Sequence, residues 1–363
     1  MLHKLIFSCC FFILVRSSAE AQCMVPFQDV NNYVYLFDAG QSNFIENLPL
    51  RNYKVGRKNI FAYIGQNNRL KVYYRGKNYT VNDNTPNYFM TDNLFAYQNF
   101  NQIKVLYGNE FRQLEGFFRE GQDSLYVSDS MIVWQNVLGE LNVFYNGAVQ
   151  LIERSEIKRA KISDNLFAYI DLTGTFKVFY RGELTVLETY EPTNFLVNRD
   201  MIMYIDYYGN FKYFEFGESK ETQLPQVMEY WTGEGFGVYM SVLKQLIVHY
   251  KGEETTLIED RPQNLVIKEN IIAYTDKGKN FWCWYKGKKY WLERYIPLQF
   301  EVENDIIVYQ DIDGRLKAFY YGEQVAVSDQ MVKKFSLYNE AVSYSIFPYE
   351  TKIWCNKQTY TFR

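Results

Sequence analysis

The sequence predicts an all-β protein built from about ten tandem copies of a unit of 35 residues. Three observations carry this prediction: a glycine that recurs at a fixed interval, short apolar runs bounded by turn residues, and prolines confined to one phase of the repeat. A period between about 20 and 50 residues is the mark of a repeat architecture in which each unit packs on its neighbours.

The recurring glycine closes a segment that is copied along the chain. Residues 165–182 are closely matched by residues 59–76, 270–287 and 305–322. The glycine falls at Gly40, Gly76, Gly108, Gly147, Gly182, Gly217, Gly252, Gly287 and Gly322, so the last five intervals are each 35 residues, and a tenth copy ends at Lys357.

Each unit is predicted to hold four short strands, which we name a to d. In the fifth copy, strand b covers residues 165–170 and strand c covers residues 175–180. Asp171 and Gly174 bound the turn between them, because Asp bonds its local backbone and Gly adopts positive φ. Strand d follows the c–d turn at residues 184–188, so strands b, c and d form a meander.

A proline-bearing loop precedes strand a, which is expected at residues 195–197, 265–267 and 300–302 in three of the copies. Proline cannot donate to a strand ladder, so its phase marks a loop. Six of the eight prolines occupy this phase: Pro49, Pro86, Pro192, Pro225, Pro262 and Pro297. In a closed ring these longest loops would all lie on one face.

A single meander exposes apolar surface on both sides and must stack on neighbouring units. The unit resembles a β-propeller blade in its strand order, its tight c–d turn and its longer d–a loop, and the resemblance covers the whole mature chain. It lacks the Trp-Asp and Gly-His pairs of WD repeats and the aspartate box of sialidases. We therefore expect a β-propeller of no particular propeller family, with an open β-superhelix as the alternative.

The two ends of the repeat raise the question of how a ring would close. The mature chain begins at an equivalent of strand b, residues 23–27, and ends at an equivalent of strand d, residues 359–362. No leftover terminal strand is available to complete a neighbouring blade. A disulfide between Cys23 and Cys355 would replace strand exchange, and the alternative is two unpaired thiols.

The N-terminus has the order of a secretory signal peptide. Lys4 precedes an apolar run over residues 5–15 and a small-residue stretch over residues 17–21. Cleavage after Ala21 would leave residues 22–363 as one β-repeat domain. The apolar run is about half of the roughly 20 residues that span a bilayer, so we expect a secreted or periplasmic protein with no membrane span.

The charge pattern excludes a nucleic-acid partner. The formal net charge is -3, and Lys and Arg recur at regular intervals without forming a basic patch. The mature chain contains one histidine, His249, in a column otherwise filled by residues such as Phe179, and no His and Cys cluster has the spacing of metal ligands. The sequence therefore indicates no catalytic residues, no metal and no cofactor.

Periodic charged residues have plain structural interpretations. We interpret turn aspartates such as Asp171 and Asp206 as turn formers, with a calcium-binding rim as the alternative. The acidic column after strand d, including Glu153 and Glu188, and the lysine column of strand c, including Lys177, are expected to keep exposed strand edges soluble.

The clearest break in the repeat lies at residues 229–237. Tyr230 and Trp231 could form a ligand platform for a sugar, with Glu234 as an acid or base. The alternative is a bulged strand with extra glycine.

Three functions remain open. The leading hypothesis is a secreted, non-catalytic binding or scaffold protein, monomeric, whose loop face binds a protein or a glycan. The second is a glycan lyase or hydrolase, which predicts three or more acidic residues from different copies converging within a few ångströms. The third is a structural component of an envelope.

Overall fold

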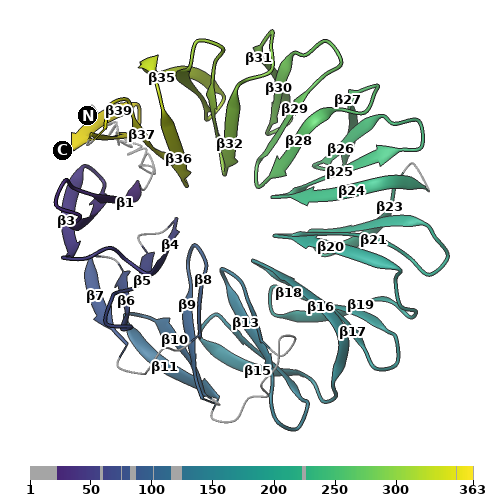
Figure 1. Cartoon of the computed structure of the whole chain (residues 1–363). Coiled ribbons are helices and arrows are strands. Elements are labelled where there is room, and N and C mark those ends of the chain that lie inside the picture. The colour runs from purple at the N-terminus through teal and green to yellow at the C-terminus, as the bar shows by residue number, and fades with distance from the viewer. Residues whose placement is uncertain are drawn as a thin grey trace, which may run out of the picture.

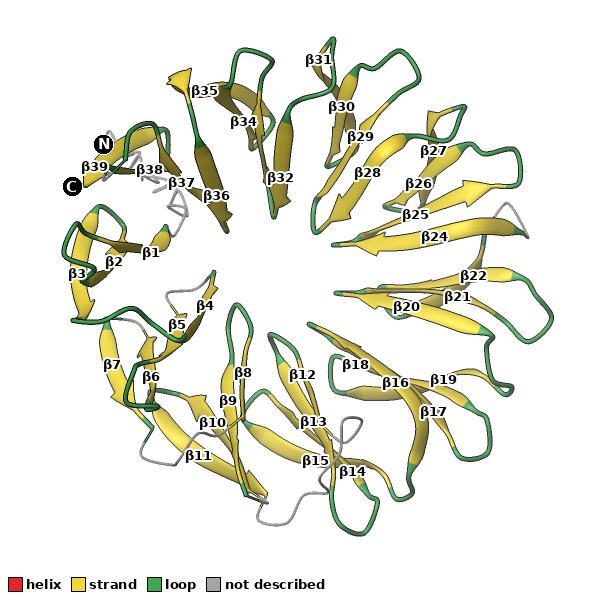
Figure 2. Cartoon of the chain, in the orientation of Figure 1, coloured by secondary structure: helices red, strands yellow, loops and turns green. Residues whose placement is uncertain are grey.

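The computed structural model describes residues 23–57, 60–74, 76–81, 87–100, 102–115, 125–222, 226–348 and 350–362. The predicted leader, residues 1–21, lies outside these ranges. The regular secondary structure of the described residues is entirely strand, coloured yellow in Figure 2, so none of these residues belongs to a helix able to cross a membrane.

The strands form ten antiparallel sheets, nine with four strands and one with three. Each sheet is one blade, and the blades are numbered in chain order. The first five contain β1 (Met24–Gln28), β2 (Val34–Asp38), β3 (Gln41–Glu46); β4 (Asn52–Gly56), β5 (Ile60–Ile64), β6 (Leu70–Tyr74), β7 (Lys77–Thr80); β8 (Asn87–Met90), β9 (Phe95–Asn99), β10 (Gln102–Tyr107), β11 (Glu110–Glu115); β12 (Leu125–Val127), β13 (Met131–Gln135), β14 (Leu141–Tyr145), β15 (Ala148–Glu153); β16 (Ile157–Ser163), β17 (Leu166–Asp171), β18 (Phe176–Tyr180), β19 (Glu183–Glu188). The last five contain β20 (Asn194–Asn198), β21 (Met201–Ile205), β22 (Phe211–Glu215), β23 (Glu218–Glu221); β24 (Val227–Gly233), β25 (Phe236–Ser241), β26 (Leu246–Tyr250), β27 (Glu253–Ile258); β28 (Gln263–Lys268), β29 (Ile271–Thr275), β30 (Phe281–Tyr285), β31 (Lys288–Glu293); β32 (Gln299–Glu303), β33 (Ile306–Gln310), β34 (Arg315–Tyr320), β35 (Glu323–Met331); β36 (Lys334–Tyr338), β37 (Ala341–Ser345), β38 (Thr351–Cys355), β39 (Gln358–Phe362).

The blades follow one another in sequence order around a central axis, and the first and last blades meet (Figure 1). The structure is therefore the closed β-propeller that the sequence predicts, and the open β-superhelix is excluded. In every four-stranded blade strand a is innermost and strand d outermost. Because neighbouring strands reverse direction, the a–b and c–d turns share one face, the turn face, and the b–c turns and d–a loops share the other, the loop face.

The c–d turn explains the recurring glycine. Arg181 and Gly182 both have positive φ, 50° and 97°, as a two-residue hairpin turn of type I′ requires. Glycine adopts this conformation without strain. The last blade uses Asn356 and Lys357 at the same two positions, with φ of 49° and 63°.

The b–c turn follows the predicted chemistry. Asp171 Oδ1 accepts hydrogen bonds from the backbone N–H groups of Thr173 and Thr175 at 2.9 and 3.0 Å. Desolvation would raise the pKa of Asp171, but the hydrogen bonds from the Thr173 hydroxyl, from Lys177 and from the N–H of Thr175 lower it to about 2. The aspartate therefore has a sufficient role in fixing the turn.

The core lies between successive blades. Strand b is its most buried element, and all six residues of β17 are buried. The same inward position in five successive blades is a fully buried tyrosine: Tyr169, Tyr204, Tyr239, Tyr274 and Tyr309.

Three of these tyrosines join a polar cluster that links two blades. Tyr169 Oη lies 3.4 Å from Glu153 Oε2 at the end of the preceding blade. Lys177 Nζ lies 2.6 Å from the same carboxylate and 2.9 Å from Asp171. The arrangement recurs around Tyr204 and Tyr309. We call this Tyr-Glu-Lys-Asp cluster the clasp. The Glu and Lys columns, which we expected from the sequence to keep exposed strand edges soluble, thus also pair with each other between blades.

Blade 1 closes the ring without an inner strand. Its first strand, β1, is the equivalent of strand b, and it pairs only with β2 among the described strands. A disulfide joins Cys23 at the start of β1 to Cys355 in β38 of the last blade, with the Cα atoms 6.1 Å apart. Cys283 is a buried, unpaired thiol in strand c of blade 8, and burial raises its pKa well above the usual value.

Candidate functional site

The a–b turns of successive blades bring a periodic polar column to the axis of the ring on the turn face. One residue at the same phase of each turn makes up this column: Arg57, Asp92, Asp129, Asp164, Arg199, Glu234, Glu269, Asn304 and Asn339. Acidic residues flank it at Asp200, Glu303, Asp305 and Glu340. We call this set the axial ring.

The carboxylates of the axial ring bind the backbone of neighbouring turns. Asp92 Oδ1 accepts the N–H of Arg57 at 3.1 Å, and Asp129 Oδ1 accepts the N–H of Asp92 at 2.7 Å. In the last blades the direction reverses, so that Glu269 accepts the N–H of Asn304 at 3.2 Å and Glu303 accepts that of the following turn at 2.6 Å. Side chains of the ring therefore link one blade to the next.

Two arginines balance part of this negative charge. Arg57 Nε lies 3.0 Å from Asp92, and its Nη1 lies 3.7 Å from Glu234. The contact with Glu234 joins blade 2 to blade 7, which is five blades away and so opposite it in a ring of ten. Arg199 Nη1 lies 3.1 Å from the same Glu234. The axial opening is therefore bridged by ion pairs at the turn face.

Two acidic residues at the axis, Asp164 and Glu303, have raised pKa values. Desolvation, with the nearby charges of Asp129 and Glu234, raises the pKa of Asp164 to about 6. Desolvation also raises the pKa of Glu303 to about 7. The hypothesis of an enzyme predicted three or more acidic residues from different blades within a few ångströms of one another, and Asp129, Asp164 and Glu234 are near enough for their charges to interact. The described residues nonetheless contain no group of three His, Cys, Asp or Glu arranged to hold a metal ion.

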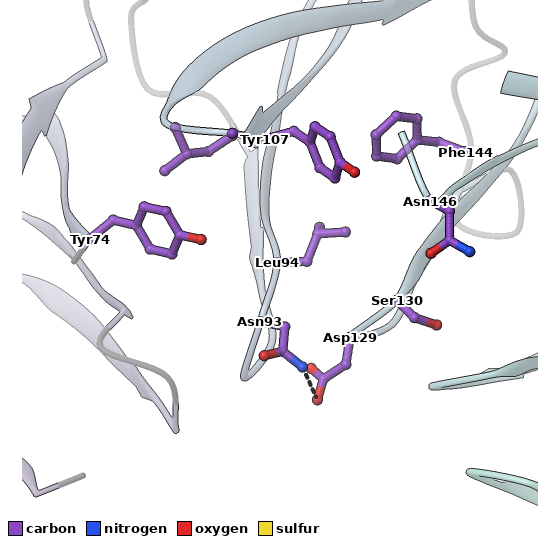
Figure 3. A pocket seen from close by; sticks show the side chains of 10 residues that line it. Tyr74, Asn93, Leu94, Tyr107, Asp129, Ser130, Phe144 and Asn146 are labelled. Atoms are coloured by element: carbon purple, nitrogen blue, oxygen red, sulfur yellow. Dashed lines mark hydrogen bonds between the residues drawn. The ribbon is translucent and has the colours of Figure 1, made fainter. Parts of the chain in front are cut away.

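A pocket opens on the turn face beside the axial ring, between blades 3 and 4 (Figure 3). Its volume is about 510 Å³. Apolar and aromatic groups come from Leu94, Leu106, Phe144, Tyr74 and Tyr107, and polar groups come from Asn93, Asp129, Ser130 and Asn146. The pocket thus combines aromatic walls with a carboxylate, two amides and a hydroxyl.

Two short side chains account for the pocket. Leu106 occupies the column of Phe144, Phe179 and Phe214, which is aromatic in every other blade. Tyr107 holds the place of Tyr180, whose Oη donates to Asp200 Oδ1 at 3.0 Å. Ser130 holds the position of Asp200 in blade 4, and its buried Oγ makes no hydrogen bond within the described part of the chain. The shorter leucine therefore leaves a space, and the shorter serine leaves an unsatisfied hydroxyl.

Two side chains fix the shape of the pocket. The rings of Tyr107 and Phe144 meet edge to face, with centroids 5.4 Å apart. Asp129 accepts hydrogen bonds from the N–H of Asp92 at 2.7 Å and from Asn93 Nδ2 at 3.4 Å, so its carboxylate is held at the pocket edge nearest the axis (Figure 3).

The structure does not assemble a platform from Tyr230 and Trp231. The two residues are neighbours in β24, so their side chains lie on opposite faces of the sheet. Tyr230 packs on Phe211 of the preceding blade at 5.1 Å, and Trp231 packs in the core shared with the following blade. Glu234 is separated from both and belongs to the axial ring through Arg57 and Arg199.

His249 proves to have a polar partner in the core. Its Nε2 lies 3.1 Å from Glu215 Oε2, and its ring packs 4.1 Å from that of Tyr213. His249 and Glu215 are 1% and 5% exposed, so the histidine fills the aromatic column as predicted while adding a buried inter-blade contact.

Sequence reasoning missed both the axial ring and the pocket. The ring had a detectable signal, because seven of its nine column positions are charged and most are spaced by 35 residues. The pocket had one as well, since Leu106 interrupts a column of aromatic residues. Neither signal says by itself that these positions meet.

Comparisons with known proteins agree with the observed architecture. A family model described as "10-bladed beta propeller domain" matches residues 18–360. No curated protein matches the chain. Similar solved structures include the computationally designed Ika8 protein, with 16% identity, a TM-score of 0.34, and coverage of 74% of this chain and 95% of that one. Another is the CRINKLY WD40 ectodomain of the Arabidopsis thaliana receptor kinase ACR4, with 8% identity, a TM-score of 0.34, and coverage of 66% and 98%. A third is PorZ of Porphyromonas gingivalis, with 9% identity, a TM-score of 0.27, and coverage of 95% and 59%.

Proposed function

Because the chain belongs to the family of 10-bladed beta propeller domains, we propose that it is an exported, non-catalytic binding protein that holds a glycan in the pocket between blades 3 and 4. Export follows from the predicted leader, residues 1–21. The proposal of a glycan as the ligand rests on the residues that line this pocket.

The lining of the pocket suits a sugar. The rings of Tyr107 and Phe144 offer faces and edges to the apolar side of a pyranose ring. Asp129, Asn93, Asn146 and Ser130 offer acceptors and donors to hydroxyl groups. A few polar groups placed around an apolar lining are typical of small-ligand sites.

The carboxylates of the axial ring are occupied by hydrogen bonds and ion pairs, which supports a binding role over a catalytic one. Asp92, Asp129, Glu269 and Glu303 accept backbone N–H groups, and Glu234 is paired with two arginines. These bonds use the carboxylates to join blades.

The test is a glycan array probed with the protein, followed by titration of the best ligand against the Leu106→Phe variant. The substitution restores the aromatic residue of the repeat and fills the pocket, so we expect affinity to fall by at least about tenfold, equivalent to 1.4 kcal/mol. Thermal stability should be kept, because phenylalanine is accommodated at this position in five other blades.

A matched control is Phe179→Leu, which removes the corresponding ring between blades 4 and 5, where Phe179 meets Tyr145 with centroids 5.9 Å apart. We expect this variant to lose stability and to keep its affinity for the glycan. Unchanged affinity in Leu106→Phe, or an equal loss in both variants, would remove the pocket from the proposal. A protein that retains no glycan would favour the third hypothesis, an envelope component without a soluble ligand.

A glycan hydrolase or lyase is the second candidate, because the raised pKa of Asp164 is what a general acid near neutral pH needs. The assay is release of new chain ends from any glycan that the array identifies. Activity that disappears in Asp164→Asn while binding persists would favour the enzyme.

A further inference from the structure

The inner edge of blade 1 is a strand position that the described chain leaves unfilled. In the nine other blades strand b pairs with strand c on one side and with an inner strand a on the other. In blade 1 the strand-b equivalent, β1, has β2 on one side and no described strand on the other. An unpaired strand edge presents backbone donors and acceptors to any extended chain that reaches it.

The main-chain contacts show which groups face this open edge. The carbonyl of Cys23 accepts the N–H of Ala39 at 3.3 Å, and the N–H of Asp29 donates to the carbonyl of Tyr33 at 3.1 Å. Alternate residues of a strand point their backbone groups to the same side. Residues 23, 25, 27 and 29 therefore face β2 or its turn, and Met24, Pro26 and Gln28 face the open edge.

Pro26 is a residue type that proteins tolerate on a strand at the edge of a sheet. It occupies the column of Ala168, which pairs with Lys161 of the inner strand in blade 5. Proline has no N–H to donate, and proteins tolerate it where a strand lies at an edge. The open edge thus offers N–H groups at Met24 and Gln28 and carbonyls at all three positions.

A cavity lies beside this edge. A pocket of about 510 Å³ is lined by Pro26, Phe27, Gln28 and Asp29 of blade 1, by Leu50 and Tyr53 of blade 2, and by Ser343 and Thr351 of blade 10. Toward the axis, the hydroxyls of Tyr53 and Tyr338 meet across the gap at 3.4 Å. The cavity therefore has walls from both neighbouring blades and one wall made of backbone that pairs with no other described strand.

The disulfide makes the inner strand dispensable for closing the ring. It joins blade 1 to blade 10 covalently through Cys23 and Cys355, and Phe27 and Phe37 pack on Phe362 and Tyr360 with centroids 4.5 and 4.9 Å apart. The closure thus leaves the position of strand a available.

We propose that the inner edge of blade 1 is a docking site for an extended segment of another polypeptide, which pairs with β1 as the fourth strand of the blade. A row of alternating backbone donors and acceptors is matched by a polypeptide main chain, as in other cases of strand addition. An apolar residue of that segment would meet Phe27, Leu50 and Tyr53. The inference depends on removal of the predicted leader, because cleavage after Ala21 leaves Gln22 as the only residue before Cys23. It does not depend on the glycan pocket.

The experiment follows backbone hydrogen exchange at the open edge. The protein is recovered from a secreting host, mass spectrometry establishes its first residue, and exchange of the Met24 and Gln28 amides is measured with and without a synthetic peptide of residues 298–304, the inner-strand sequence of blade 9. We expect both amides to slow by at least about tenfold when the peptide binds. The amides of Val25 and Phe27, which face β2, should change little.

Two variants separate backbone pairing from other modes of binding. A peptide methylated on alternate backbone nitrogens should lose binding, because it cannot donate to the carbonyls of the edge. Pro26→Ala restores an N–H that faces the peptide, so it should tighten binding by a few-fold, as expected for about 1 kcal/mol from one added hydrogen bond.

Three results would overturn the proposal. The first is absence of protection with the peptide in both the parent protein and Pro26→Ala. The second is equal binding of the methylated peptide. The third is protection of Met24 and Gln28 without peptide in protein that retains residues 1–21, which would assign the edge to the chain's own N-terminal segment.

Discussion

The interface between blades 4 and 5 and the interface that closes the ring solve the same packing problem with different chemistry. Between blades 4 and 5, the clasp of Tyr169, Glu153, Lys177 and Asp171 links the outer end of one blade to the middle of the next. At the closure, the columns of Tyr169 and Lys177 hold Phe27 and Tyr35, whose rings stack 5.6 Å apart.

The closure adds a covalent bond that no other described interface has, Cys23 to Cys355. The difference follows from the distance along the chain. Successive blades are joined by a short loop, so a polar clasp needs only to fix their orientation. The first and last blades are 332 residues apart at the disulfide, and closing so long a loop costs more conformational entropy.

The largest expected effect comes from breaking the covalent closure. Replacing both Cys23 and Cys355 with Ser should lower the free energy of unfolding by about 5 to 6 kcal/mol in the chain-entropy treatment of a loop of 332 residues. Chemical denaturation measures this change. The control is Cys283→Val, which restores the residue of the repeat column and should cost less than about 1.5 kcal/mol. A double variant that unfolds within 1 kcal/mol of the parent, by the usual accuracy of such measurements, would show that aromatic packing alone closes the ring.

A smaller effect is expected from breaking the clasp. Lys177→Met removes the cation from Glu153, whose side chain is 17% exposed, and should lower the free energy of unfolding by about 1 to 3 kcal/mol. The matched control is Lys357→Met, since Lys357 pairs with Glu323 at the surface, with side chains 51% and 66% exposed. That change should cost no more than about 1 kcal/mol. Equal losses in the two variants would mean that the clasp adds nothing beyond a surface ion pair.

The smallest effect concerns pH and Asp164 of the axial ring, which meets Asp129 across the interface between blades 4 and 5. The folded-state pKa of Asp164 is raised to about 6 from 3.8, so the folded protein binds more protons than the unfolded chain between these values. The free energy of unfolding should therefore fall as the pH rises from about 4 to about 6. Asp164→Asn removes this contribution, making the protein more stable than the parent at pH 7 and flattening its profile over that range. Urea denaturation across pH tests it, with the exposed Asp313→Asn as control, and an unaltered profile in Asp164→Asn would contradict the expectation.

Much of the fold could be predicted because the repeat carries local rules. Gly182 and its equivalents mark a turn whose backbone needs positive φ, and Asp171 marks a turn that its carboxylate stabilises. The pairing of Cys23 with Cys355 could be proposed because both lie at the ends of the repeat and a ring makes those ends neighbours. The break in the pattern at Tyr230 and Trp231 signals altered packing as readily as a ligand site, so the ligand platform there stays a prediction.

The sequence by itself determined the unit, its strands, its turns and the order of the blades, since each depends on residues a few positions apart. Only the tertiary structure decided which columns meet: Glu153 with Lys177, Arg57 with Glu234 across the axis, and Leu106 with the unsatisfied Ser130. The physical reason is that these contacts depend on the number of blades and on how each blade is turned against the next. Both are set by packing between blades, and no single repeat records them.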